Sequence, residues 1–298
     1  MRQNKISAFF NRHIKVIYMI PCILFLLFMV IYPLGYTLYM SLTDWTMSSV
    51  TGPNFTGIEN FIKLFKDKYF TSSIVLTLKY SALSLVFEMF VGLVLALMLN
   101  RKKMFMRNVA KTIMLIPMSM TPVAVGMIWK LLMDPAIGLF NYALKAIGMA
   151  PCEWLGSTKT VLSSLILIDV WEWSPMVALI ILAGLSSISS DIDEAAIMDG
   201  ANYMQRVIHI TIPMTLNTIL TAALLRLIDV LKTFDIIYST TQGGPAFQSQ
   251  TINIYSYLYA FQYYKYGYAS ASMIVFTLLV LLVAGIVMYI RAKAVVDR

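Results

Sequence analysis

The residues best suited to chemistry are charged and aromatic side chains that fall inside long apolar stretches. Asp169 and Glu172 lie three residues apart in the run IDVWEWSP, and Trp171 and Trp173 flank the second carboxylate. Carboxylates accept hydrogen bonds from hydroxyl groups, and indole rings cover the apolar face of a sugar ring. The set therefore suits carbohydrate recognition. The same two acids would be equally well satisfied by Lys or Arg on a neighbouring helix.

A second charged set follows one apolar run at intervals of three, with alternating sign: Arg226, Asp229, Lys232 and Asp235. Successive members are neighbours on a helix, so internal ion pairs would offset part of the cost of burial. Because three residues fall about 60° short of a turn, the row winds around the helix. We expect some members to seal an interface between subunits and others to face a hydrated cavity, and the sequence leaves open which. Weaker intramembrane candidates are Lys79, Glu88 and Lys130.

A polar segment, DIDEAAIMDGANYMQRVIHITIP, separates two apolar runs and ends at Pro213. Asp191 followed three residues later by Glu194 has the pattern of a capping box. Gly200 falls where a helix would end in the left-handed conformation, and Asn202 would begin another helix. The segment therefore predicts a short helix, a bend and a second short helix.

The charge of this segment indicates what it contacts. It carries Asp191, Asp193, Glu194 and Asp199 against the single cation Arg206. Helices that lie on lipid headgroups usually carry Lys and Arg on their polar face. The acidic sign favours a protein partner.

The elements that position these residues are membrane helices. Of 298 residues, 59% are hydrophobic and 13% charged, with a mean hydropathy of +0.75, whereas soluble domains carry about 25% charged residues. We therefore predict an all-α polytopic membrane protein. Six segments reach the roughly 20 apolar residues that a bilayer requires: Ile17–Leu42, Ile74–Leu99, Ile113–Met133, Val161–Ile188, Met214–Tyr238 and Ala269–Ile290.

The distribution of basic residues sets the orientation. The N-terminal tail, the connection from Arg101 to Lys111 and the C-terminal tail are basic, and positive loops mark the cytoplasm. Both termini and the polar segment are thus predicted to be cytoplasmic. The first apolar run exceeds a signal-peptide core, so we expect an uncleaved helix. We expect a first part at residues 1–72, a helical core at 73–290 that includes the polar loop 190–213, and a tail at 291–298.

Several function classes are disfavoured. The chain contains no G-x-x-x-x-G-K-[ST] phosphate-binding loop and no nucleophile elbow, so it is not expected to hydrolyse ATP or to be an enzyme. Cys22 and Cys152 lack paired metal-ligand spacing, and no metal or bound cofactor is expected. The net charge of +8 is concentrated beside apolar runs, which argues against a nucleic-acid partner.

The polar segment resembles the EAA signature of the membrane subunits of binding-protein-dependent ABC importers. The matching residues are Glu194-Ala195-Ala196, Asp199-Gly200-Ala201 and Ile210-Thr211-Ile212-Pro213. Further stretches are similar to the sugar-importer branch of maltose and glycerol-phosphate type: Ile31-Tyr32-Pro33, Gly57-Ile58-Glu59-Asn60-Phe61, the run from Asp169 to Pro175, and Gly243-Gly244-Pro245.

The resemblance implies a type I importer permease fold, with six transmembrane helices and a cytoplasmic coupling helix that docks on a separate ATPase. The coupling residues would be Glu194, Ala195, Ala196, Asp199, Gly200, Ala201, Ile212 and Pro213. The implied partners are a second homologous permease, two ATPase subunits that use the ATP, and a periplasmic or lipid-anchored solute-binding protein, all at a bacterial inner membrane. The implied substrate is an oligosaccharide, monosaccharide, sugar acid or related polyol. The alternatives are an ion-coupled secondary transporter that uses the intramembrane carboxylates, and a membrane enzyme.

Overall fold

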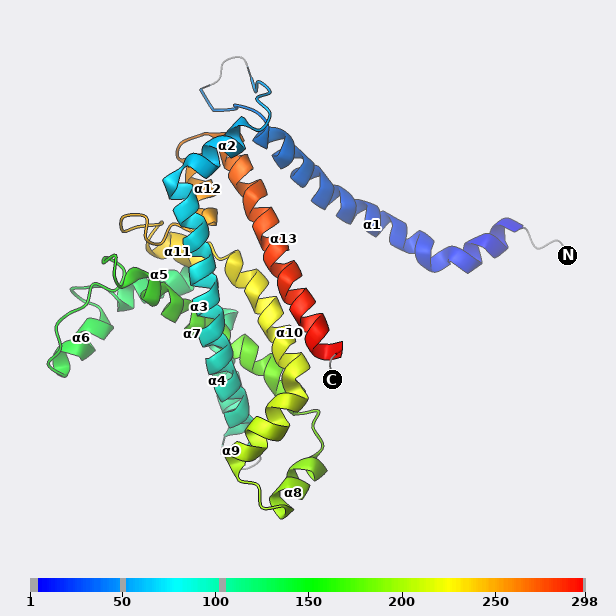
Figure 1. Cartoon of the computed structure of the whole chain (residues 1–298), viewed down its shortest axis with the longest axis vertical. Coiled ribbons are helices and arrows are strands. Elements are labelled where there is room, and N and C mark those ends of the chain that lie inside the picture. The colour runs from blue at the N-terminus through cyan, green and yellow to red at the C-terminus, as the bar shows by residue number, and fades with distance from the viewer. Residues whose placement is uncertain (1–4, 49–51, 102–105, 297–298) are drawn as a thin grey trace. The chain divides into compact units, whose positions relative to one another are not determined.

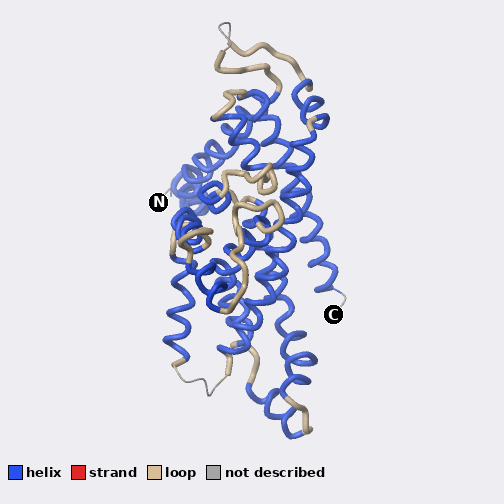
Figure 2. Tube along the Cα trace, turned by 90° about the vertical axis from the view of Figure 1, so that its left-hand side faces the viewer, coloured by secondary structure: helices blue, strands red, loops and turns tan. Residues whose placement is uncertain are grey.

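A computed structural model describes residues 5–48, 52–101 and 106–296, and the regular structure in these ranges is helical (Figure 2). Five helical stretches there are long and apolar enough to cross a membrane, or six if one bent pair counts as a single span. They lie in α1 (Lys5–Ser41), α3 (Lys68–Leu99), α7 (Val161–Leu185), α9 to α10 (Tyr203–Arg206 and Ile212–Leu231) and α13 (Tyr266–Val296). The prediction of an all-α polytopic membrane protein is confirmed.

Shorter helices connect these spans. They are α2 (Glu59–Lys66), α6 (Leu139–Ala146), α8 (Ser190–Met198), α11 (Asp235–Thr240) and α12 (Ile252–Phe261), together with a π-helical turn at Val207–Thr211.

The third span is broken, and the prediction of one continuous helix over Ile113–Met133 is wrong. The chain forms α4 (Arg107–Ser119) and α5 (Pro122–Leu132), and their axes are bent by 96°. Thr121 is extended, with φ −73° and ψ 137°, because the ring of Pro122 disfavours helical backbone in the residue before it. Pro122 then occupies the first position of α5, where no N–H is needed.

The chain forms two compact units, one of residues 67–255 with 276–298 and the other of residues 1–66 with 256–275. In the larger unit α3 packs along α7, and α10 contacts both (Figure 1). The buried core between them consists of Ala96, Leu99, Val177, Ala178, Ile181, Leu182, Leu185 and Ala222. Because lipid is as apolar as these side chains, close packing rather than exclusion from water stabilises this contact.

Gly92 shows how close α3 and α7 come. A Cβ atom at this position would lie 2.5 Å from Val177 Cγ1 and 3.2 Å from the backbone nitrogen of Ala178. Only glycine allows this approach, which is typical of small residues at helix contacts in membranes. Glu88 lies one turn earlier on the same buried side of α3.

In the smaller unit, the chain leaving α1 is fixed against the start of α13. The amide of Gly267 donates to the carbonyl of Trp45 at 3.0 Å, and the Trp45 ring packs against Tyr266. Asn60 of α2 donates through Nδ2 to the carbonyls of Ser41 and Thr43, at 2.9 and 2.7 Å. These bonds satisfy carbonyls that the end of α1 leaves unpaired.

Candidate functional site

The polar segment folds as the predicted helix, bend and helix, and we refer to residues 189–213 as the coupling loop, after the role that the resemblance implies. Its first helix, α8, begins two residues earlier than expected. Ser189 is the N-cap, and its Oγ accepts a hydrogen bond from the amide of Asp191 at 3.3 Å. The predicted capping box of Asp191 and Glu194 is therefore wrong. Both carboxylates lie within α8, where acids near the start complement the helix dipole.

The bend is formed as the sequence predicts. Gly200 has φ +81°, a backbone conformation that is strained for any residue with a Cβ atom. The strain would come from the backbone alone, because no other atom lies within 4 Å of the position that a Cβ would occupy. The amide of Ala201 donates to the carbonyl of Ala196 at 2.9 Å and closes α8. Asn202 then caps α9 in a reciprocal capping box with Gln205, with bonds of 2.9 and 2.8 Å.

A π-helical turn joins the coupling loop to α10, a feature that the sequence interpretation missed. The amide of Ile212 donates to the carbonyl of Val207, five residues back. Pro213 explains the wider turn, because its ring would clash with the carbonyl of His209 in a regular α-helix and it has no N–H to donate. In the sequence, the hydrophobic-x-hydrophobic-Pro ending was therefore the signal that could have predicted this π-helical turn.

The outer surface of the loop combines exposed acids with exposed apolar groups. Asp191, Asp193, Glu194, Ala195 and Asp199 are exposed, while Ala196 is buried. Large apolar side chains lie exposed around them: Ile197, Met198, Tyr203, Met204 and Ile208. Exposed apolar groups edged by charge are typical of a protein-binding surface.

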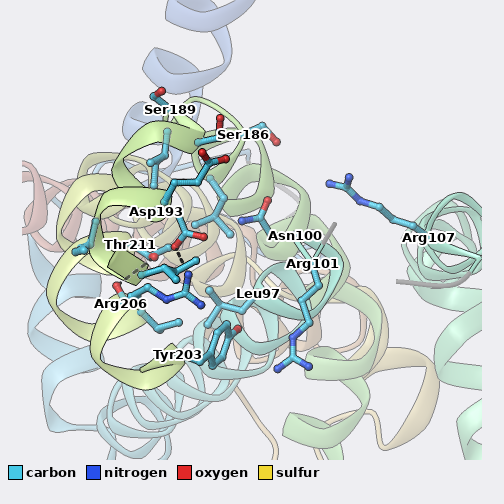
Figure 3. A pocket seen from close by; sticks show the side chains of 17 residues that line it. Leu97, Asn100, Arg101, Arg107, Ser186, Ser189, Asp193, Tyr203, Arg206 and Thr211 are labelled. Carbon is cyan, nitrogen blue, oxygen red and sulfur yellow. Dashed lines mark hydrogen bonds and ion pairs between the residues drawn. The ribbon is translucent and has the colours of Figure 1, made fainter. Parts of the chain in front are cut away.

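Two contacts hold the loop in place (Figure 3). Arg206 Nη1 lies 2.8 Å from Asp193 Oδ1, so an ion pair joins α9 to α8. The guanidinium of Arg101, which follows α3, lies 4.9 Å from the centre of the Tyr203 ring. The loop is thereby tied to the end of α3 as well as continuous with α10.

Within the apolar region, Arg226 of α10 lies at the centre of a buried charge cluster. Its Nε donates to Glu88 Oε2 at 2.6 Å, and its Nη2 donates to Glu88 Oε1 at 2.9 Å and to Asp169 Oδ2 at 3.0 Å. The side chains of Glu88 and Asp169 are fully buried, and Arg226 is 3% exposed. The ring of Trp173 covers the guanidinium at 4.9 Å. One cation thus joins α3, α7 and α10.

Glu172 is the unpaired member of this group. It is fully buried, and neither carboxylate oxygen has a hydrogen-bond partner in the part of the chain that the structure describes. Asp169 Oδ1 is likewise without a partner there. Two carboxyl groups therefore share the guanidinium, the third has no partner, and the cluster has capacity to accept further hydrogen bonds.

The row of four charges expected on one helix is interrupted, and the predicted pairing along it is only partly right: Asp229 pairs with Lys232, but Arg226 pairs with Glu88 and Asp169 of other helices. The helix ends at Leu231, with Lys232 as its C-cap, and Asp235 begins α11. Lys232 pairs only loosely with Asp229, at 3.6 Å with both side chains about half exposed. Arg226 pairs with other helices because a buried guanidinium is best satisfied by a bidentate carboxylate.

Of the remaining predicted residues, Trp171 lies outside the buried charge cluster. It is 39% exposed and packs edge-on against Trp129 of α5 at 5.5 Å, in a column of rings that continues through Phe140 to Trp154. Lys79 and Lys130 are exposed. The structure thus brings Asp169, Glu172, Trp173 and Arg226 together and adds Glu88, whose buried place on α3 the sequence indicated only weakly.

This combination of apolar spans, a buried charge cluster and an exposed loop with its own caps defines a membrane-embedded transport subunit. The family described as binding-protein-dependent transport system inner membrane component matches residues 88–297. The chain belongs to this family, whose members are multi-pass inner-membrane components of ABC transporters.

Known relatives agree. The chain is 39% identical to a probable ABC transporter permease protein, y4oQ, of Sinorhizobium fredii, over 75% of this chain and 72% of the relative. It is 32% identical to the trehalose/maltose transport system permease protein MalF of Thermococcus litoralis, over 85% and 86%. Among solved structures, a bacterial ABC transporter involved in import of the acidic polysaccharide alginate superposes with a TM-score of 0.83 at 23% identity, covering 97% of this chain and 99% of that one. This likeness confirms the permease fold.

Proposed function

We propose that this chain forms part of the translocation path of an ATP-driven carbohydrate importer and transmits the movement of a separate ATPase through its coupling loop. The observation that carries the proposal is the coupling loop itself: a capped helix–bend–helix with exposed acids and apolar side chains, on a chain with no phosphate-binding loop. Such a chain needs a motor on another polypeptide, and this surface is suited to bind one.

The assembly that fits contains a second, homologous permease, two ATPase subunits and a periplasmic or lipid-anchored solute-binding protein in a bacterial inner membrane. Both termini and the coupling loop lie in the cytoplasm, in keeping with the basic connections. The residues that couple the chain to the ATPase are those of the motif: Glu194, Ala195, Ala196, Asp199, Gly200, Ala201, Ile212 and Pro213. Ala196 is the buried member of this set. In this division the chain binds no cofactor, and the partner uses the ATP.

A carbohydrate fits the chemistry of the charge cluster. Glu172 and Asp169 Oδ1 are unfilled acceptors, and hydroxyl groups are the donors that sugars provide. The guanidinium of Arg226 is occupied by two carboxylates, so it is not available to attract an acidic sugar. A neutral sugar therefore fits best, in keeping with the trehalose/maltose relative. Asp229, Lys232 and Asp235 remain candidates for the path only where α10 gives way to α11.

Reconstitution tests the proposal. The chain, its sister permease and the ATPases are placed in liposomes with the solute-binding protein outside, and uptake of labelled trehalose and maltose is measured. We expect uptake that requires both ATP and the binding protein. Uptake driven by a pH gradient, with neither ATP nor partners present, would instead favour a secondary transporter that uses Glu172 as its proton site.

A specific variant tests the docking surface. Glu194→Lys reverses one exposed charge on α8 and should reduce co-purification of the ATPase, whereas Glu153→Lys reverses an acid in the connection between α6 and α7 and should not. Equal recovery of the ATPase with both variants would remove Glu194 from the contact.

A further inference from the structure

Helix α2 has an exposed apolar side that neither the fold nor the proposed function uses. Its buried side consists of Asn60 and Leu64. Ile58, directly before the helix, and Ile62 are 66% and 48% exposed, and Phe65 is 58% exposed. The amide of Ile62 donates to the carbonyl of Ile58 at 3.1 Å, so Ile58 is already in the helical register. Spacings of four and three place Ile58, Ile62 and Phe65 on one side, which we refer to as the apolar stripe of α2.

The charged side chains of α2 lie on a third side of the helix. Glu59, Lys63 and Lys66 are exposed, and Lys63 Nζ lies 2.7 Å from Glu59 Oε1. At about 100° per residue, these three charges lie roughly 100° around the helix from the apolar stripe. An apolar side with Lys beside it is typical of helices that lie in the plane of a membrane surface. The sign is opposite to that of the coupling loop, where acids favour a protein partner.

Hydrogen bonds hold α2 at the level where two membrane spans end. Asn60 Nδ2 donates to the carbonyls of Ser41 and Thr43, at the end of α1, at 2.9 and 2.7 Å (Figure 1). The carbonyl of Trp45, two residues further along, accepts from the amide of Gly267 in the first turn of α13. Because α1 and α13 are both long and apolar enough to cross a membrane, the point at which they meet lies near the membrane surface. The chain itself therefore sets the depth of α2.

Aromatic side chains mark the same level. Trp45 packs against Tyr266, the first residue of α13, and Tyr263 and Tyr264 just before it are exposed. Tyr and Trp are enriched where a membrane meets water. The exposed apolar residues of α1 extend to Tyr39 in its last turn, so apolar surface reaches the level at which α2 is attached. Depth and charge thus both favour lipid as the surface that covers the stripe.

We propose that α2 is an interfacial helix whose apolar stripe enters the acyl boundary of a phospholipid surface, with Lys63 and Lys66 directed to the lipid phosphates. Long Lys side chains can extend their amino groups in this way. In the orientation proposed above, this surface is the outer leaflet of the inner membrane. Because Asn60 joins α2 to the last carbonyls of α1, the inserted stripe fixes the depth of the junction between α1 and α13.

The test measures the depth of single nitroxide labels on the complete transporter in nanodiscs of phosphatidylcholine and phosphatidylglycerol. The background carries Cys22→Ser and Cys152→Ser, and the cysteines of the other subunits are removed. Ile58→Cys and Ile62→Cys place the label on the stripe, and Lys63→Cys places it on the charged side as the matched control. Collision rates are measured with oxygen, which concentrates in lipid, and with a nickel chelate, which stays in water. The ratio of oxygen to nickel collisions should be severalfold higher at both stripe positions than at the control.

Three results would overturn the proposal. Frequent nickel collisions at all three positions would place α2 in water. Few collisions with either reagent at Ile58 and Ile62 would show that protein, such as the sister permease, covers the stripe. A loss of oxygen collisions at Ile62 when the solute-binding protein is added would make the stripe a docking site for that protein. None of these readouts requires transport, so a failure of carbohydrate uptake leaves the test unaffected.

Discussion

Replacing Arg226 by methionine should destabilise the protein more than any other single change in the charge cluster. Methionine has an unbranched apolar side chain, so the substitution retains a long side chain at this position. It removes three hydrogen bonds, of 2.6, 2.9 and 3.0 Å, to two fully buried carboxylates. Glu88, Asp169 and Glu172 would then share a buried region with no cation among them.

The magnitude follows from the cost of an uncompensated buried charge. Removing one partner of a buried ion pair destabilises by roughly 3–5 kcal/mol. Glu88→Gln should cost less, about 1.5–3 kcal/mol for a charge-assisted bond, because Asp169 still neutralises Arg226. In the Arg226→Met background, Glu88→Gln should become stabilising, since it then removes a carboxylate that has no counter-charge.

Heating the purified transporter in detergent and measuring the fraction that stays monodisperse tests this order. Lys232→Met is the control: its ion pair is about half exposed, so the expected change is within about 0.5 kcal/mol. If Arg226→Met unfolds at the same temperature as Lys232→Met, or if Glu88→Gln adds its full cost in both backgrounds, the carboxylates are not held by this cation and the cluster is not a structural tie.

Three further outcomes are expected. Gly200→Val should uncouple ATP hydrolysis from uptake, whereas Gly148→Val, at an equally open position with φ +77°, should cost similar stability and keep the ratio of ATP hydrolysed to sugar imported; the same ratio in both would contradict the coupling role. Gly92→Leu should abolish stable expression by separating α3 from Val177, and a correctly folded variant would show that the 2.5 Å approach is unimportant. Asn141→Ala should expose the connection between α5 and α7 to added protease, because Asn141 Oδ1 accepts from the Cys152 amide at 2.9 Å, and unchanged cleavage would refute this.

The coupling loop was predictable because its geometry is set by residues close in sequence. Gly200 needs only its own φ, and the Asn202–Gln205 capping box joins residues three apart. The start of α8 was misassigned because Ser189 and Asp191 are both good caps, and the sequence does not rank them.

The charge cluster was only partly predictable, because its bonds join residues far apart in the chain. Glu88 and Arg226 are separated by 138 positions, and no periodicity in one helix reveals which face meets another. The end of α10 at Leu231 was hidden for a related reason: no glycine or proline marks it, and the next three residues, Lys232, Thr233 and Phe234, occur readily in helices. The break in the third span, by contrast, had its signal in Pro122.

Helix α10 connects the two sites. It begins at the π-helical turn, directly after the coupling loop, and reaches Arg226 thirteen residues after Pro213, about 20 Å along the helix. At that point Arg226 is bonded to α3 and α7, so α10 cannot slide alone without breaking buried charge-assisted bonds. Movement of the loop must therefore either stop at the π turn, where the wider hydrogen-bonded ring provides a hinge, or carry α3, α7 and α10 together as one body. The close contact at Gly92 favours the second outcome, since it fixes α3 to α7 one turn from Glu88. Cross-linking α3 to α7 through cysteines near this contact should then leave transport intact, and so should a cross-link between the coupling loop and the end of α3, because these parts move together. Loss of transport on the second cross-link would instead place the hinge at the π turn.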